Sequence, residues 1–509
     1  MNSMLLPLLV GIPMFAAGTL VMISERPRIH AAVLLTVSSA SMVAGGALTV
    51  QLAQGGAIAH GVGKWPFGIA IPFAADLFTA LMLTVTGLLT VTCVAFAMAS
   101  DRASSRYFAP LVLVLIAGVN GALLTVDLFN LFVFIEVMLL PSYGLFVLSA
   151  PAKAPLRQVA GARLYVSINL LASTVFLTGV AFVYGTVGTV NIAELAGLAR
   201  HDDTLAISLA VCLFALGIKA AVVPVHGWLA RAYPATSPAV TALFSGLHTK
   251  VAIYAIYRIY AVIFDGDARF LWIGVTLFCV TMVIGVLGAV GENTTRSILA
   301  FNMVSGIGYI LLGVALFTEA GLAAGIFYLI HHMIVKASLF LSTGAIEVRY
   351  GTGHLGVLGG LAKREPVIAA VFFIGALSLA GLPPFSGFVA KYALVAASLD
   401  AGQIIAAALM IVVSLLSLLS MLKIWSGMFW GGDTAGGDAN RAQPADGSPT
   451  AVRTAERPKI GAALAAPAVV LAIVTLALGL GAELLLSLSQ TAALGLLDPT
   501  SYLEAVRNS

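Results

Sequence analysis

Long apolar segments follow one another along almost the whole chain, and few polar residues interrupt them. Continuous apolar runs of about 20 residues are typical of transmembrane helices, whereas strands of membrane barrels alternate in polarity over about 10 residues. The pattern therefore predicts an all-α polytopic membrane protein. We count fourteen candidate spans: 4–24, 29–51, 74–99, 108–125, 128–149, 161–184, 205–225, 237–263, 270–291, 297–317, 319–345, 367–398, 403–430 and 460–488.

The segments between the spans suggest how the chain is organised. Residues 52–73 are glycine-rich and predict a hairpin, and residues 431–459 form a long polar stretch with the composition of a flexible linker. We expect five parts: N-terminal helices 1–107, a five-helix unit 108–263, a second five-helix unit 270–430, a cytoplasmic linker 431–459, and a final helix with a tail 460–509.

Composition supports a bilayer environment and excludes several partners. The chain has 509 residues, of which 60% are hydrophobic and 9% charged, and a soluble domain of this size carries far more charge. The net charge of +4 is small and spread over loops, so we expect no nucleic-acid partner.

The basic residues indicate an orientation. With the N-terminus outside, sixteen of the 26 Lys and Arg residues fall in inner loops and five fall on the outer side, leaving five within spans. Because cytoplasmic loops carry the excess of Lys and Arg, this bias favours fourteen helices with both termini outside.

Five lysines and one acid lie deep inside predicted spans: Glu136, Lys219, Lys250, Lys336, Lys391 and Lys423. Each costs about 2.5–3.5 kcal/mol at a helix centre on insertion scales, so they must face a paired or hydrated interior. Lysines outnumber the single acid, and Glu136 with Lys219 is the expected neutralising pair. A buried lysine releases its proton more readily than an exposed one, so a row of lysines predicts proton transfer. For Lys423, near a span end, a structural and a functional role are equally supported.

Histidines accompany the lysines in the stretch IFYLIHHMIVKASLF at 326–340. His332 and Lys336 are four residues apart and share one helix face, whereas His331 points about 100° away from His332. We therefore expect His332 to act with Lys336, and His331 to be a packing residue.

Prolines predict breaks in the seventh and twelfth helices. Pro224 follows Lys219, and Pro383 and Pro384 precede Lys391. Proline removes a backbone donor, and broken helices that face a cavity mark transport sites. The two segments resemble each other and lie five spans apart, which predicts an inverted repeat of spans 4–8 and 9–13. Lys391 lies in the last third of its span and is the expected outer end of the lysine row.

Other chemistries find little support. Cys93, Cys212 and Cys279 are isolated in apolar segments, which argues against iron–sulfur and zinc sites. The GTGHLG stretch at 351–356 has no strand before it and is not a dinucleotide motif. We expect no cofactor and no metal centre, and a transporter subunit instead of an enzyme.

Three stretches carry a resemblance to a known family: PVHGWLARAYPATSPAVTALFSGLHTKVAIYAIYRI at 224–259, IHHMIVKASLFLSTG at 330–344 and LAGLPPFSGFVAK at 379–391. They resemble the antiporter-like subunits shared by respiratory complex I and Mrp-type cation/proton antiporters. Within that family the chain looks most like the D-type Mrp subunits, because the twelfth span carries Lys391 and the chain ends near residue 509.

The resemblance implies a set of functional residues. Glu136 and Lys219 would form the functional pair, Lys250 the central member, His332 and Lys336 its continuation, and Lys391 the end. We add His248, on the same helix as Lys250, and call these seven residues the polar row.

The leading hypothesis is a proton-translocating subunit of a multisubunit Na⁺/H⁺ antiporter in the bacterial plasma membrane. Its partners would be the other membrane subunits, protons, and Na⁺ or else K⁺ or Li⁺. Glu136 is the only acid deep in a span, so the sodium path is expected largely outside this chain. The alternative is a proton-pumping subunit of an NADH-quinone oxidoreductase or a membrane-bound hydrogenase.

Overall fold

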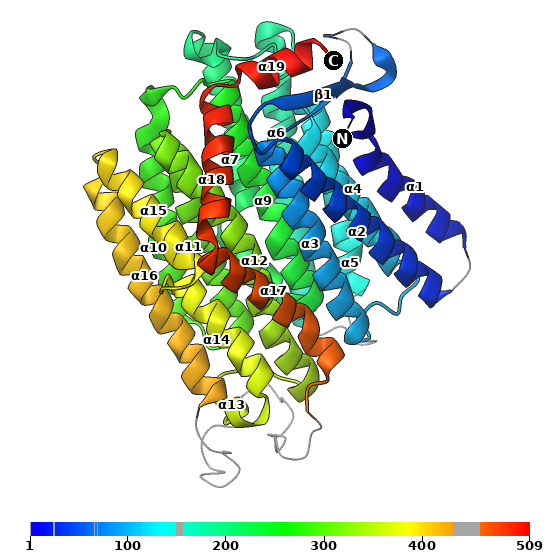
Figure 1. Ribbon diagram of the computed structural model, residues 1–509, viewed down its shortest axis with the longest axis vertical. Coiled ribbons are helices and arrows are strands. Elements are labelled where there is room, and N and C mark those ends of the chain that lie inside the picture. The colour runs from blue at the N-terminus through cyan, green and yellow to red at the C-terminus, as the bar shows by residue number, and fades with distance from the viewer. Residues whose placement is uncertain (1, 24–25, 66, 69, 149–155, 431–458) are drawn as a thin grey trace.

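A computed structural model describes residues 2–23, 26–65, 67–68, 70–148, 156–430 and 459–509. The described part is a bundle of helices with one small hairpin (Figure 1). The helices are α1 Leu8–Met22, α2 Pro27–Gln51, α3 Leu77–Ala99, α4 Phe108–Leu124, α5 Leu128–Leu148, α6 Leu156–Val187, α7 Asp203–Ala220, α8 Gly227–Ala232, α9 Pro238–Val262, α10 Leu271–Gly291, α11 Thr295–Leu316, α12 Glu319–Tyr350, α13 Leu361–Arg364, α14 Pro366–Ala380, α15 Ser386–Asp400, α16 Ile404–Ile424, α17 Ala462–Leu480, α18 Ala482–Leu497 and α19 Thr500–Arg507.

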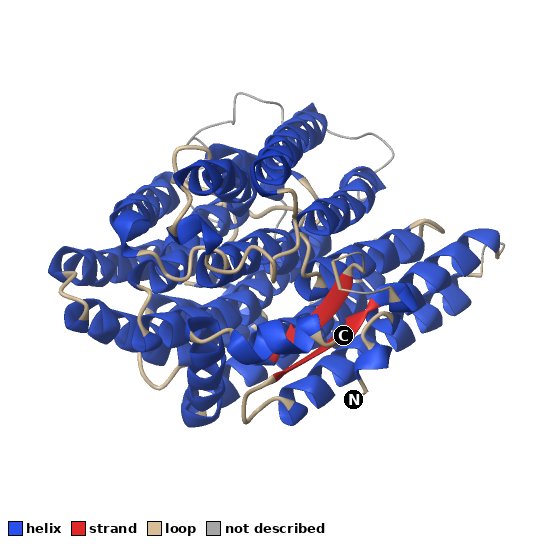
Figure 2. Ribbon diagram, turned by 90° about the horizontal axis from the view of Figure 1, so that it is seen from above, coloured by secondary structure: helices blue, strands red, loops and turns tan. Residues whose placement is uncertain are grey.

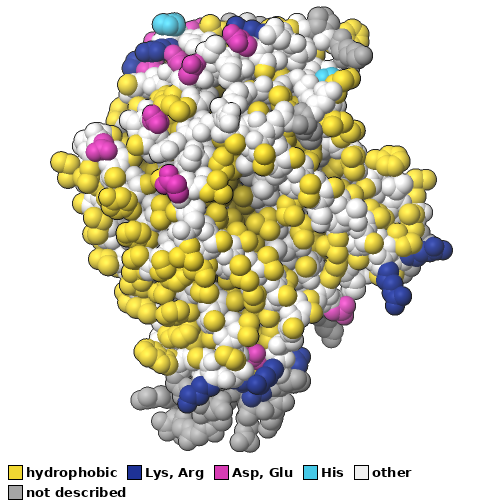
Figure 3. All heavy atoms as spheres, in the orientation of Figure 1, with side chains coloured by type: hydrophobic (Ala, Val, Ile, Leu, Met, Phe, Trp, Pro, Cys, Tyr) yellow, Lys and Arg dark blue, Asp and Glu magenta, His cyan; other side chains and the backbone are white. Residues whose placement is uncertain are grey.

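Both termini lie at one end of the molecule, which we call the terminal face (Figure 1). The opposite end, where residues 430 and 459 lie, is called the linker face. Charged side chains gather near the two ends, and hydrophobic side chains cover the band between them (Figure 3). A membrane protein has this distribution because its middle band contacts hydrocarbon. The all-α membrane fold predicted from the sequence is therefore confirmed.

The predicted hairpin at 52–73 is also confirmed. Strand β1 (Ala57–Gly61) pairs antiparallel with β2 (Pro72–Asp76), with His60 opposite Phe73. The hairpin lies at the terminal face beside the C-terminal helix α19, as the view from above shows (Figure 2).

Helix ends follow local sequence signals. The Asp76 carboxylate caps α3 by accepting the backbone N–H of Thr79, and the Ser237 hydroxyl caps α9 ahead of Pro238. Such caps satisfy N–H groups that have no partner inside the helix. Gly381 ends α14 with a φ of +84°, a conformation that costs glycine little.

Two long helices form the centre of the bundle. Every residue in the most apolar 18-residue window of α9 and of α12 is buried, whereas only 33% of that window is buried in the peripheral α1. The central helices carry Lys250 and Lys336, so these amines lie far from the lipid.

Twelve helical stretches in the described part of the chain are long and apolar enough to cross a membrane. The fourteen spans counted from sequence stay a prediction, because α4, α14 and α18 are shorter than a typical span. The linker predicted at 431–459 lies outside the described residues apart from Lys459. The five-part division and the inverted repeat also stay predictions.

Candidate functional site

The titratable members of the polar row from α7, α9, α12 and α15 are all buried. Relative exposure is zero for Lys250, His332 and Lys336, and at most 7% for the others, Lys219, His248 and Lys391. Burying an ammonium group is costly unless its donors are satisfied, so the partners of each amine show how the fold accommodates it.

Lys219 lies in the last turn of α7 and bonds to α6. Its Nζ donates to Ser173 Oγ at 2.9 Å and to the Asn169 carbonyl oxygen at 3.4 Å. Glu136 on α5 is within electrostatic range of Lys219, but these two described residues form no ion pair within 4.0 Å. Glu136 Oε1 is buried and has no hydrogen-bond partner in the described part of the chain. The expected pair is therefore near but not in contact.

His248 joins three helices. Its Nε2 lies 2.9 Å from Ser142 Oγ on α5, and its Nδ1 lies 2.8 Å from Tyr165 Oη on α6. Both ring nitrogens thus have hydroxyl partners, and a neutral imidazole can donate at one and accept at the other. His248 and Lys219 both bond to side chains of α6, at Tyr165 and Ser173.

Lys250 and Lys336 occupy the middle of the row. Lys250 Nζ donates to Thr249 Oγ1 at 3.1 Å, and Lys336 Nζ donates to the Leu299 carbonyl oxygen at 3.0 Å. The two helices that carry these lysines, α9 and α12, pack against each other.

The two adjacent histidines differ in their contacts. His331 Nδ1 lies 2.8 Å from Ser386 Oγ at the start of α15. Neither ring nitrogen of His332 has a hydrogen-bond partner among the described residues, and its ring stacks with Tyr328 at 6.0 Å between centroids. The roles expected of the two histidines, with His332 acting together with Lys336 and His331 packing, stay predictions. Helical spacing placed the two rings on different faces but could not show which face meets α15.

Lys391 lies beside the end of α14. Its Nζ donates to the Ala380 carbonyl oxygen at 3.1 Å and to Ser414 Oγ on α16 at 2.9 Å, and it lies 5.2 Å from the centre of the Tyr309 ring. Ala380 is the last residue of α14, so its carbonyl is one that the interruption frees from helical bonding.

Helical structure is interrupted at both proline sites. Helix α7 ends at Ala220 and α8 begins at Gly227, with Pro224 between them. Helix α14 ends at Ala380 and α15 begins at Ser386, with Pro383 and Pro384 between them. Both lysines therefore lie beside an interruption of helical structure, as predicted. That each interruption divides a single transmembrane span into two halves stays a prediction.

Lys423 has a structural environment. Its Nζ donates to the carbonyl oxygens of Val290 (2.9 Å) and Glu292 (2.7 Å), at the C-terminal end of α10. A cation at this position satisfies carbonyls that lack helical partners and complements the helix dipole. These contacts favour the structural role over a place in the row.

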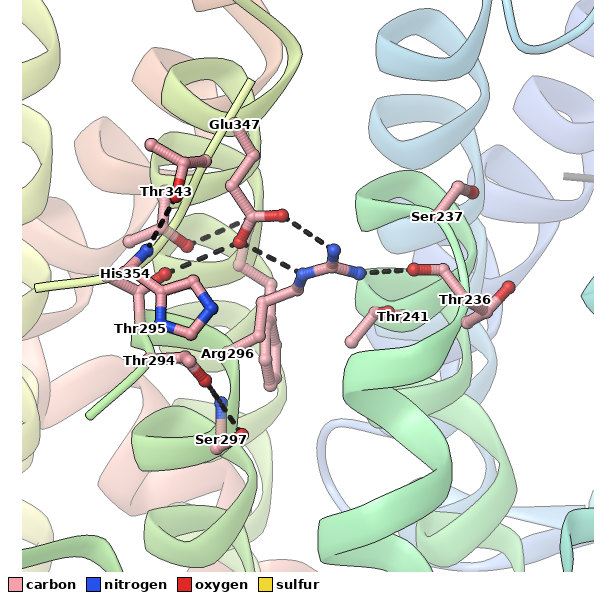
Figure 4. A network of polar contacts seen from close by, with 12 residues as sticks. Thr236, Ser237, Thr241, Thr294, Thr295, Arg296, Ser297, Thr343, Glu347 and His354 are labelled. Atoms are coloured by element: carbon pink, nitrogen blue, oxygen red, sulfur yellow. Dashed lines mark hydrogen bonds and ion pairs between the residues drawn. The ribbon is translucent and has the colours of Figure 1, made fainter. Parts of the chain in front are cut away.

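A second polar cluster joins α11, α12 and the residues ahead of α9 (Figure 4). Arg296 on α11 forms an ion pair with Glu347 on α12, with 2.6 Å between Nη2 and Oε2, and also donates to the Thr236 carbonyl oxygen ahead of α9. Neither side chain contacts a member of the polar row, so we assign this cluster to the scaffold.

An apolar cavity lies apart from the row. It has a volume of about 740 Å³ and an apolar lining from α7, α9, α10 and α11, including Gly217, Pro224 and Phe278. No member of the polar row lines it. The candidate site is therefore a line of buried side chains and not a pocket.

Sequence reasoning missed the hydroxyl partners of the row and one buried ion pair. Ser173, Tyr165 and Ser414 bind row members from neighbouring helices, and Ser386 binds His331, the neighbour of His332. Nothing in the spacing of these four residues marks them. Arg258 was counted as an outer-side cation, but it is 2% exposed and pairs with Asp76. Arg258 lies eight residues after Lys250, on the same face of one helix, and this spacing could have indicated that its side chain is buried as well.

Comparison with known proteins agrees with this geometry. The family model described as NADH:quinone oxidoreductase/Mrp antiporter, TM, matches residues 125–417. The chain belongs to this family. It is 38% identical to the D-type subunit of the Na(+)/H(+) antiporter of Alkalihalophilus pseudofirmus, with 99% of each chain covered. The family resemblance predicted from the three sequence stretches is confirmed.

Solved structures show the same fold. A chain in the Mrp complex from Dietzia sp. DQ12-45-1b is 58% identical to this one, with a TM-score of 0.94 and 99% of each chain covered. A chain of respiratory complex I from Thermus thermophilus has a TM-score of 0.73 at 23% identity, with 94% of this chain and 98% of that chain covered. The second likeness shows the fold alone.

Proposed function

We propose that this chain is the proton-translocating membrane subunit of a multisubunit monovalent cation/proton antiporter in a bacterial plasma membrane. The main support is the row of buried amines and imidazoles at the centre of the bundle, in which Lys250 and Lys336 lie near enough for their charges to interact. The likeness to a D-type Na(+)/H(+) antiporter subunit over the full length of both chains supports the same function.

In this proposal the terminal face is outside and the linker face is inside. Lys219 in α7 and Lys391 in α15 are the two ends of the row, and Lys250 and Lys336 are its middle. Protons would pass between groups that are not directly bonded through water molecules in the interior. Glu136 stabilises the protonated form of Lys219, so a change in their separation shifts that proton toward His248.

His331 and Ser386 form the link to the last amine in this scheme. The imidazole lies on the same helix as Lys336 and is hydrogen-bonded to the first residue of α15, which carries Lys391. The charges of both lysines act on His331. A neutral imidazole in this position can accept a proton from one side and release one to the other.

The exchanged cation is proposed to be Na⁺, or else K⁺ or Li⁺, with its path largely in other subunits. A sodium ion prefers several oxygen ligands, and Glu136 is the only carboxylate in the row. Assembly with other membrane subunits is therefore part of the proposal, and the solved Mrp complex that contains a similar chain supports it.

The test is cation/proton exchange in vesicles from antiporter-deficient cells that express the whole complex. Glu136→Gln and Lys219→Met should each lower exchange at least tenfold at normal expression. Glu483→Gln and Lys363→Met change exposed side chains and should leave exchange unchanged. Full exchange in both row variants would overturn the proposal, and copurification with flavin and iron–sulfur subunits would favour a redox-driven pump instead.

A further inference from the structure

A buried ion pair lies on the terminal-face side of Lys250. Lys250, Tyr254 and Arg258 are each four residues apart on α9, so they lie along one helix face. Arg258 is 2% exposed and Asp76 is 6% exposed. Two buried charges in place of apolar residues are costly to keep, so their position beside a row lysine calls for a functional explanation.

Hydroxyl groups connect the helix turn after Lys250 with the carboxylate of this pair. Tyr254 Oη lies 2.7 Å from Thr79 Oγ1, and Thr79 Oγ1 donates to Asp76 Oδ1 at 2.9 Å. The chain of hydroxyl, hydroxyl and carboxylate runs toward the terminal face, where Asp76 ends β2. The Tyr254 hydroxyl also donates to the Leu123 carbonyl oxygen at 2.9 Å, so its hydrogen must turn toward Thr79 before the chain can carry a proton outward from the centre of the bundle.

The guanidinium of Arg258 contacts every member of this chain. It donates to both Asp76 carboxylate oxygens, at 2.7 and 2.8 Å, to Tyr254 Oη at 3.1 Å and to Thr79 Oγ1 at 3.4 Å. An arginine keeps its proton in proteins and has no acceptor. An additional proton on the chain would therefore meet a fixed positive charge at short range, as at the arginines that exclude protons from water pores.

The C-terminal helix α19 covers the Arg258 guanidinium. The Tyr502 ring of α19 lies over the Arg258 guanidinium, 4.5 Å from ring centre to Cζ, and Tyr502 is 2% exposed. Water is thus kept from the guanidinium, and its field is screened little.

We propose that Arg258, held by Asp76 and covered by Tyr502, is a fixed-charge barrier that closes the terminal-face side of Lys250. A proton on Lys250 then passes sideways to Lys336 and not straight outward, so proton movement stays tied to the complete row. This inference rests on the proposed function, because it assigns protons to Lys250.

Passive proton flux tests the barrier. The purified complex is placed in proteoliposomes, and flux is driven by a potassium diffusion potential without an exchangeable cation. The double variant Arg258→Gln/Asp76→Asn keeps polar side chains but removes both charges. Because glutamine is smaller than arginine, water can enter beside Thr79 and take over the part of the Asp76 carboxylate in the chain. We expect roughly a tenfold faster proton leak than in the wild type, which corresponds to about 1.4 kcal/mol off the barrier.

Three further variants separate a barrier from general damage. Arg258→Lys keeps the charge and should stay tight. Adding Tyr254→Phe to the double variant interrupts the hydroxyl chain and should return the passive proton flux to the level of the wild type. Arg269→Gln/Asp267→Asn removes another ion pair near the same face, formed by a half-exposed arginine, and should not leak.

The inference would be overturned if the assembled Arg258→Gln/Asp76→Asn variant had the same passive proton flux as the wild type. It would also be overturned if this variant and Arg269→Gln/Asp267→Asn showed equal proton flux. If the double variant does not assemble, Tyr502→Ala replaces it, because water admitted beside the guanidinium screens its charge. A rise of roughly threefold is then expected, and no rise overturns the inference. Exchange by the wild type in the same vesicles tests the proposed function separately.

Discussion

The imidazole of His331 on α12 lies 2.8 Å from the hydroxyl oxygen of Ser386, the first residue of α15. This contact joins the helix of Lys336 to the helix of Lys391 at the interruption between α14 and α15. It makes Ser386 a positioning residue for the last step of the proposed proton path.

Replacing Ser386 by alanine should slow cation/proton exchange without preventing assembly. The lost hydrogen bond has a net value of about 1–1.5 kcal/mol, so a fall of roughly tenfold is expected. Ser398→Ala is the matched control, because Ser398 lies on the same helix and bonds only to the Leu394 carbonyl within it. Equal exchange rates in the two variants would remove Ser386 from the path.

A methyl group on Gly479 should disturb the same interruption. A Cβ atom there would lie 2.5 Å from the Pro384 carbonyl oxygen and 2.7 Å from the Ser386 nitrogen, so backbone must move. We expect Gly479→Ala to lower exchange and to shift its pH profile, because the surroundings of His331 change. Gly495→Ala on α18 has open space and should behave as the wild type. An unchanged profile in Gly479→Ala contradicts the expectation.

Lys423→Met should lower stability and spare turnover. The variant loses two charged hydrogen bonds at the end of α10, which at a half-buried site corresponds to about 1–3 kcal/mol of unfolding free energy. Thermal unfolding of the solubilised complex measures the loss, and exchange per folded complex should stay within roughly twofold of the wild type. A loss of turnover at full stability would instead place Lys423 in the proton path.

The contribution of Asp76 to the free energy of unfolding should change with pH only in the acid range. Burial by itself raises the pKa of Asp76, but the charge and hydrogen bonds of Arg258, with those of Thr79, outweigh it and leave the pKa below the usual 3.8. A lowered pKa in the folded state means stabilisation that is complete above the unfolded value and is lost as pH falls below about 3.8.

Thermal unfolding of the wild type and Asp76→Asn at several pH values checks this sign. At neutral pH the variant should be about 3–5 kcal/mol less stable, because Arg258 is left buried without its partner. The difference should stay constant from about pH 7 to 5 and shrink only in stronger acid. A difference that changes between pH 7 and 5 would contradict the assignment.

The apolar pattern was sufficient to predict the helical membrane fold. A transmembrane helix must satisfy its backbone hydrogen bonds internally, so each span appears in the sequence as a long apolar run. The row lysines were visible for the same reason, since a charge inside an apolar run stands out. Ser173, Ser386 and Ser414 were not visible, because serine is tolerated in many membrane helices and only tertiary packing brings these hydroxyls to the amines. Pairing of Arg258 with Asp76 spans 182 residues, so no local pattern contains it.

The contact of His331 with Ser386 could not be predicted from the sequence for a related reason. A helical wheel gives the angle between neighbouring side chains but not the identity of the helix that each one faces. The contact between the Tyr502 ring and Arg258 likewise depends on where the C-terminal helix packs on the bundle, which is set by the topology of the whole chain.

The Glu365 carboxylate, buried near the linker face, accepts hydrogen bonds from the Tyr350 hydroxyl at 2.7 Å and from the backbone N–H of Ile460 at 2.9 Å. Ile460 lies two residues before the first residue of α17, Ala462, so this contact fixes the starting point of that helix from the body of the protein. The register of α17, and with it the seat of Gly479 against Pro384, is thereby independent of how many residues connect α16 to α17. Insertions or deletions within 431–458 are consequently expected to leave exchange intact, which makes this segment a suitable place for a fused reporter domain.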